Sequence, residues 1–232
     1  MIIPCIDLMD HKVVQLVQGK EKALELPDPV AVLEKFAAFA EIQVIDLDAA
    51  MGREPQRDIV RDLCRRKPSR VGGGMGSVER AFQAIEDGAS KVIVGSAAFV
   101  GRGINHNFLR SLAASVPRAR LMIAVDCLDD HVAVRGWQQV LPLTSAEVLP
   151  DLEPYCAEFL CTCIDVEGQL QGTNLEWFRK LRAATTLPIT AAGGITTEEE
   201  ISALERLGMN AALGMSIYRR FFPELFEPQK RE

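Results

Sequence analysis

The sequence has no long apolar run, no surplus of basic residues and few histidines or aromatic residues. No stretch approaches the roughly 20 apolar residues that cross a membrane. The first residues, MIIPCIDLMD, contain neither a basic segment nor a cleavage site. We therefore expect a cytoplasmic protein without a membrane partner. Lys and Arg (26) are outnumbered by Asp and Glu (32), and a nucleic-acid backbone requires clustered basic side chains, so we expect no nucleic-acid partner.

The six cysteines are too scattered for a disulfide scaffold. Cys161-x-Cys163 is the only close pair, and neither a second pair nor a histidine lies near it. A structural zinc site needs four such ligands, so we expect no metal and assign the pair to two positions of one strand. In a reducing compartment the cysteines act as small buried hydrophobic residues.

Short apolar segments alternate along the chain with segments of helical period. The 232 residues, 48% hydrophobic and 25% charged, are enough for one full core. Alternating strand and helix patterns predict βαβ units and a parallel sheet. Eight cycles predict an α/β fold, a single (β/α)8 TIM barrel over residues 1–232. The predicted strands are Ile2–Ile6, Ile42–Asp46, Ser69–Gly72, Lys91–Gly95, Leu121–Asp126, Glu158–Cys163, Pro188–Ala191 and Asn210–Gly214.

Two predicted helices have clear boundaries. Ser77–Asp87 carries an apolar stripe at i, i+3, i+4 and i+7, and a glycine follows it. Thr197–Leu207 has the same design, with Thr197 and Glu200 spaced as a capping box. We expect residues 226–232 to fray at the end of the chain.

The second half of the sequence repeats special positions of the first. Chance similarity between barrel units aligns mainly apolar residues, whereas carboxylates and glycines coincide here. A shift of 119 residues (126 − 7) aligns Asp7 with Asp126, Asp46 with Asp165, Asp48 with Glu167 and Gly95 with Gly214, and a shift of 120 aligns Gly73-Gly74 with Gly193-Gly194. We infer two duplicated half-barrels, about 1–119 and 120–232.

Two acidic residues are the candidate catalytic groups. Catalytic residues of such barrels lie at the carboxyl ends of strands, and Asp7 and Asp126 each follow an apolar strand directly. One such aspartate alone is equally well explained as a structural ion-pair partner. Two at symmetric positions favour a base and an acid that act in one turnover and move a proton along a sugar skeleton.

Glycine pairs after the third and seventh predicted strands indicate anion binding. Small residues let backbone N–H groups approach a phosphate oxygen near a helix start. One pair alone fits an ordinary tight turn, but two symmetric sites imply a small-molecule ligand with a phosphate at each end. The first predicted cradle contains Gly73, Gly74, Gly95 and Ser96, and the second contains Gly193, Gly194, Gly214 and Met215.

A loop tryptophan beside an arginine adds a further candidate. Arg135 and Trp137 of the segment RGW fit stacking over a planar ring and ordinary packing equally well. We also expect a monomer, because a closed barrel leaves no sheet edge to pair and no long exposed apolar run suggests an interface.

The blocks IPCIDL, KVVQLVQG, VIDLDAA, VGGGM, VIVGSAA, RGW, CIDVEGQLQGTN, AAGGI and ALGMSIY occur in this order between Ile3 and about Phe221. Together they resemble the phosphoribosylformimino aminoimidazole carboxamide ribotide isomerases of histidine biosynthesis. The resemblance implies an Amadori rearrangement of an aminoaldose to an aminoketose, without a cofactor.

The resemblance also implies roles for individual residues. Asp7 matches the proton acceptor and Asp126 the proton donor, and Thr162 matches a threonine near the second carboxylate. Arg135 and Trp137 match a mobile loop that closes over the imidazole.

Three positions depart from the family pattern and bear on substrate specificity. Glu167 stands where the family usually has Asp, and it is a second candidate for the acid. Gln15 stands where bacterial members often have Arg, and Thr173 replaces a Pro.

Three alternatives remain open from the sequence. The sister cyclase of the pathway is disfavoured, because its second strand block is closer to LDITAS than to IDLDAA. An isomerase that also acts on phosphoribosylanthranilate shares the chemistry. A non-catalytic relative that acts as a binding module is the third.

Overall fold

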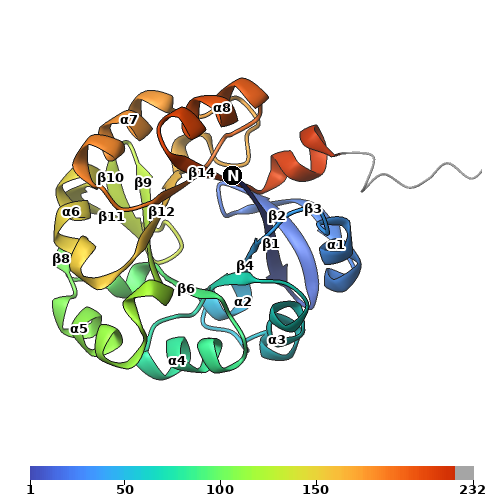
Figure 1. The fold of residues 1–232 in the computed structure, drawn as a ribbon, viewed down its shortest axis with the longest axis horizontal. Helices are drawn as coiled ribbons and strands as arrows, with labels where there is room; N and C mark the ends of the chain where they lie inside the picture. Colours follow the sequence, from blue (N-terminus) through green and yellow to red (C-terminus); the bar gives the residue numbers. More distant parts are fainter. Residues whose placement is uncertain (223–232) are drawn as a thin grey trace, which may run out of the picture.

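Eight parallel strands form a closed barrel in the computed structural model, which describes residues 1–222. Pairing of β6 with β9 and of β14 with β1 closes the cylinder, and the helices surround it (Figure 1). The predicted (β/α)8 barrel is confirmed, and the predicted frayed tail lies outside the described residues. In order around the barrel the strands are β1 (Ile2–Met9), β4 (Ile42–Asp46), β5 (Ser69–Gly72), β6 (Lys91–Val94), β9 (Leu121–Leu128), β12 (Glu158–Cys163), β13 (Ile189–Ala192) and β14 (Met209–Leu213).

The helices pack their apolar faces against the strands. Ser77 caps α4 through its side-chain oxygen, and Thr197 and Glu200 form the predicted capping box of α8. Between residues 1 and 222 no helix is long and apolar enough to span a membrane. The helices are α1 (Pro29–Lys35), α2 (Leu47–Ala50), α3 (Arg57–Arg66), α4 (Val78–Glu86), α5 (His106–Ser115), α6 (Ser145–Leu152), α7 (Leu175–Ala184) and α8 (Glu198–Arg206).

Two antiparallel hairpins extend the barrel at its carboxyl-terminal end. β2 (Lys12–Val17) and β3 (Glu21–Leu26) continue from β1, and β10 (His131–Val134) and β11 (Gln139–Thr144) continue from β9. The sequence analysis did not predict these hairpins. Because of them β1 and β9 run past the aspartates, which therefore lie inside paired strands.

The strand register corrects the predicted alignment of the two halves. Asp46 pairs with Leu8 in the first half, and Cys163 pairs with Cys127 in the second. Since Leu8 and Cys127 are equivalent, the counterpart of Asp46 is Cys163 and not Asp165. The cause is chain length, because Asp7 and Asp46 are 39 residues apart (46 − 7) whereas Asp126 and Cys163 are 37 apart (163 − 126).

The same correction applies to Asp48 and Glu167. Asp48 accepts a hydrogen bond from the backbone N–H of Asp10 at 2.8 Å, and Asp165 accepts one from Asp129 at 3.1 Å. Asp48 and Asp165 are therefore the equivalent pair, each tying a hairpin turn to the loop after the next strand. Glu167 has no acidic counterpart in the first half.

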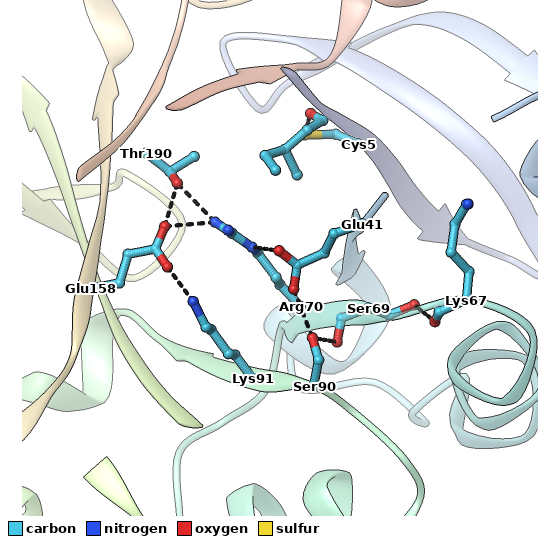
Figure 2. A network of polar contacts seen from close by, with 10 residues as sticks. Cys5, Glu41, Lys67, Ser69, Arg70, Ser90, Lys91, Glu158 and Thr190 are labelled. Atoms are coloured by element: carbon cyan, nitrogen blue, oxygen red, sulfur yellow. Dashed lines mark hydrogen bonds and ion pairs between the residues drawn. The ribbon is translucent and has the colours of Figure 1, made fainter. Parts of the chain in front are cut away.

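A buried ionic network fills the amino-terminal end of the barrel (Figure 2). The Arg70 guanidinium donates to Glu158 Oε1 at 2.7 Å, to Thr190 Oγ1 at 2.8 Å and to Glu41 Oε2 at 2.7 Å. Lys91 also contacts Glu158. Arg70 and Glu158 are each 2% exposed, so each charge depends on its partner for solvation.

We expect Arg70→Met to lower the free energy of unfolding by about 3–5 kcal/mol, because the carboxylate of Glu158 stays buried without its main partner. Urea unfolding at neutral pH measures the loss. Arg66→Met is the matched control, since Arg66 forms an exposed pair with Asp62 and should cost less than about 1 kcal/mol. Equal costs for the two variants would contradict the structural role of the network.

Candidate functional site

Asp7 and Asp126 lie on opposite walls of the barrel mouth. The strand order places four steps between β1 and β9 in either direction around the cylinder. Both side chains are only partly exposed. A ligand seated over the mouth would therefore have one carboxyl group on each side, as the sequence predicted.

Each of the two carboxyl groups is held by neutral hydrogen-bond donors. Gln15 Nε2 donates to Asp7 Oδ2 at 3.2 Å, and Trp137 Nε1 donates to Asp126 Oδ2 at 2.9 Å. Burial raises the pKa of Asp7 to about 7 against the lowering effect of Gln15. Burial also raises the pKa of Asp126, against hydrogen bonds from Thr162 and Trp137. A pKa of about 7 suits Asp7 to exchange a proton near neutral pH.

Glu167 is a third carboxyl group at the mouth. It follows a short helical turn after β12, and its Oε2 atom is buried without a hydrogen-bond partner among residues 1–222. Burial, and then the charge of Asp7, raise the pKa of Glu167 to about 7. The next residue, Gly168, packs so closely on β2 that a Cβ atom would lie 2.7 Å from the carbonyl oxygen of Leu16. This contact holds the loop of Glu167 against the β1–β2 hairpin that carries Asp7, and the unpaired oxygen of Glu167 is available to a ligand hydroxyl.

The second predicted cradle is hollow. A Cβ atom on Gly193 would lie 2.3 Å from the carbonyl oxygen of Cys163, and one on Gly194 would lie 2.4 Å from that of Gly172, so only glycine fits. Both glycines have positive φ angles. A cavity of about 40 Å³ opens here, lined among others by Glu167, Gly193, Gly194, Gly214, Met215 and Ser216.

Thr173 has a role in this cradle that a proline could not perform. Its hydroxyl donates to the carbonyl oxygen of Gly193 at 2.6 Å, and its backbone N–H donates to Glu200 Oε1 at 2.6 Å. The loop after β12 is thereby fastened to the glycine turn and to the start of α8. From the sequence Thr173 stood out only as a departure from the family pattern, and Glu200 only as part of a capping box, so their contact was not predicted.

The first predicted cradle has the same backbone form. A Cβ atom on Gly73 would lie 2.1 Å from the carbonyl oxygen of Asp46, whereas one on Gly95 would lie 3.8 Å from the nearest atom, Ala124 Cβ. The guanidinium of Arg80 donates to the carbonyl oxygen of Gly74 at 3.2 Å. Ser96 lies exposed beside this turn.

The loop between β10 and β11 connects Asp126 to the first cradle. The backbone N–H of Arg135 donates to Ser96 Oγ at 2.7 Å, while the Trp137 ring reaches Asp126. The same ring packs on Gly19 of the β2–β3 turn, where a Cβ atom would lie 3.1 Å from it. Trp137 thus spans the mouth between the two hairpins and is not part of the core.

The fold and the site together define a (β/α)8-barrel enzyme framework with opposed carboxyl groups and two glycine cradles at one end of the barrel. The model of the family described as "Histidine biosynthesis protein" matches residues 1–222. The chain belongs to this family.

Three relatives are named 1-(5-phosphoribosyl)-5-((5-phosphoribosylamino)methylideneamino) imidazole-4-carboxamide isomerase. The chain is 36% identical to the one from Methanocaldococcus jannaschii, with 94% of each chain covered. It is 34% identical to the one from Gemmatimonas aurantiaca, with 93% of this chain and 92% of the relative covered. It is 33% identical to the one from Methanothermobacter thermautotrophicus, with 94% of this chain and 93% of the relative covered.

We expect Asp7→Asn to stabilise the fold at neutral and alkaline pH. Folding raises the pKa of Asp7 from 3.8 to about 7. The contribution of Asp7 to the free energy of unfolding is therefore fully present below pH 3.8 and is lost as the pH rises to about 7. The amide of the Asn variant cannot ionise, so the variant does not lose this stability as the pH rises. Urea unfolding at several pH values should show the gain growing over this window to about 1 kcal/mol or more. A gain that is the same at pH 4 and pH 8 would contradict the raised pKa.

Proposed function

We propose that the chain is the isomerase of histidine biosynthesis that converts 1-(5-phosphoribosyl)-5-((5-phosphoribosylamino)methylideneamino) imidazole-4-carboxamide to its ribulosyl isomer. Its relatives carry the name of this enzyme. The observation that supports the mechanism most is the pair of opposed carboxyl groups, Asp7 and Asp126, between two glycine cradles. The reaction is an Amadori rearrangement of an aminoaldose to an aminoketose.

The two carboxyl groups divide the proton transfers of this reaction. Asp126 in its protonated form gives a proton to the furanose oxygen, and the ring opens to an imine at C1. Asp7 in its ionised form removes the proton from C2, which produces an enolamine. Return of a proton to C1 and loss of the hydroxyl proton at C2 give the ketose, so no atom or electron is gained from outside.

The surroundings of the pair support this division. Burial raises the pKa of Asp126 against the hydrogen bonds from Trp137 and Thr162, and no ion pair in the described chain stabilises its charged form, which favours a role as proton donor. Glu167, with its unpaired buried oxygen, would bind a sugar hydroxyl between the two aspartates. Trp137 would stack on the imidazole once it leaves Asp126.

We further propose that the substrate's two phosphate groups occupy the two glycine cradles and that the protein works as a cytoplasmic monomer. Backbone N–H groups in such turns bind anions without a surplus of basic residues. No feature of the site favours phosphoribosylanthranilate as a second substrate or a purely binding role. An assay with both phosphoribosyl compounds tests the assignment, and preferred turnover of phosphoribosylanthranilate would overturn it.

We expect Asp7→Asn to lower kcat by at least about a thousandfold, because Asp7 is the group assigned to remove the proton from C2 and its amide cannot accept that proton. KM should change by less than about threefold, since the phosphate groups at the two ends of the ligand supply most of the binding. Steady-state kinetics measures both constants. Asp165→Asn is the control, because Asp165 is an exposed carboxylate at the same end of the barrel that bonds the hairpin turn. A variant that keeps more than about a tenth of wild-type kcat would exclude Asp7 as the essential base.

We expect inorganic phosphate to raise the melting temperature and to occupy at least one cradle in crystals. Gly95→Ala should weaken phosphate binding about tenfold, because its methyl group would occupy part of the cradle while meeting the protein only at Ala124 Cβ, at an ordinary contact distance of 3.8 Å. Gly103→Ala is the matched control, since a Cβ atom there meets nothing within 4 Å and lies in the small β8 strand (Gly103–Ile104). Phosphate bound only outside the cradles would count against a bisphosphate substrate.

A further inference from the structure

Gln15 is a buried amide that lies between Asp7 and the second cradle. It belongs to β2, which pairs with the extension of β1, and only 2% of it is exposed. Its Nε2 donates to Asp7 Oδ2 at 3.2 Å. Its Oε1 lies 2.6 Å from the position that a Cβ atom on Gly214 would take. One side chain therefore contacts both the candidate base and a glycine that lines the anion cavity.

The glycine at position 214 is explained by this contact. Unlike Gly193 and Gly194, Gly214 does not have a left-handed backbone conformation. Its backbone would accept another residue, but any side chain would collide with the Gln15 amide. Gln15 and Gly214 thus form one packed unit at the junction of β2 and β14.

The charges around Asp7 make a neutral donor suitable at position 15. The charge of Asp7 raises the pKa of Glu167, Cys5 and Tyr218, and all three groups are acids. Tyr218 donates its hydroxyl hydrogen to the carbonyl oxygen of Cys5 at 2.6 Å, and Arg70 acts on Cys5 from the amino-terminal side. An amide at position 15 orients the Asp7 carboxyl group and lowers its pKa without placing a positive charge beside it.

We propose that Gln15 is a positioning residue that fixes the Asp7 carboxylate for proton removal and couples its orientation to the occupancy of the second cradle. A phosphate group seated against Gly214 confines the amide from one side, and the amide then confines Asp7 from the other. The inference rests on the proposed function, since it assigns Asp7 as the base and the cradle as a phosphate site.

The test compares wild type with Gln15→Leu, which keeps the buried volume and removes the amide. We expect kcat to fall about tenfold with KM within about threefold, because an oriented hydrogen bond to a charged group is lost. The acid limb of the kcat/KM profile should move to higher pH by roughly half a unit or more, since Gln15 lowers the pKa of Asp7. Gly214→Ala, which displaces the amide, should move the limb in the same direction.

Gln56→Leu is the matched control. Gln56 is also a buried amide that donates to a carboxylate, Asp48, at 2.6 Å, but it does not contact Asp7. This variant should lose stability and leave the pH profile unchanged. A folded Gln15→Leu protein with wild-type kcat and an unmoved acid limb overturns the proposal. If that variant does not fold, Gln15→Asn, whose shortened amide cannot reach both contacts, provides the same comparison.

A measurement without turnover separates this inference from the proposed function. Carbon NMR of labelled aspartate, with the Asp7 signal assigned by its absence in Asp7→Asn, reports the titration of Asp7 directly. Inorganic phosphate should shift that titration in wild type and not in Gln15→Leu. An equal shift in both proteins overturns the coupling even if the enzyme turns over. If the enzyme shows no turnover but phosphate shifts the Asp7 titration in wild type and not in Gln15→Leu, the proposed function is overturned. The role of Gln15 as a positioning residue is then kept.

Discussion

The guanidinium of Arg70 joins three parts of the barrel that are far apart in the sequence. Its partners are Glu41 before β4, Glu158 on β12 and Thr190 on β13. Removing one member leaves a buried charge without compensation, so the network tolerates only one arrangement of these strands. This network lies at the amino-terminal end of the barrel, whereas the opposite end holds carboxyl groups whose raised pKa values disfavour folding at neutral pH.

The mouth is electrostatically unfavourable for the same reason that it is chemically useful. Asp7, Asp126 and Glu167 are acids in a confined space, and burial raises the pKa of each. The groups that hydrogen-bond to them are uncharged amide, indole, hydroxyl and backbone N–H groups, which orient a carboxyl group without placing a positive charge beside it. Catalytic sites commonly retain such destabilising groups and depend on the remaining fold for stability.

The barrel strands were predictable because each is a short apolar segment with a clear end. β4, β5 and β12 have the predicted bounds. The hairpins were missed, since β3 reads EKALEL with a mixed exposure pattern and gains its strand form only by pairing with β2. The opposed aspartates and glycine pairs followed from symmetry in the sequence.

Other features of the site depend on three-dimensional contacts. The alignment of Asp48 with Glu167 failed because a constant shift cannot represent loops of different length in the two halves. The contact of Gln15 with Gly214 joins residues from opposite ends of the chain through a side chain inside the mouth. No local pattern in the sequence reports such a contact.

The unequal loop lengths give the two halves different chemistry at equivalent positions. The first half has Asp46 where the second has Cys163, and only the second half supplies a carboxyl group at the position of Glu167. A ligand that carries phosphate at both ends is nearly symmetric in charge, so its phosphates alone would permit two opposite orientations. If Glu167 binds the sugar hydroxyl as proposed, the lost equivalence of the halves makes the mouth directional, because the reversed orientation would leave the buried oxygen of Glu167 unsatisfied.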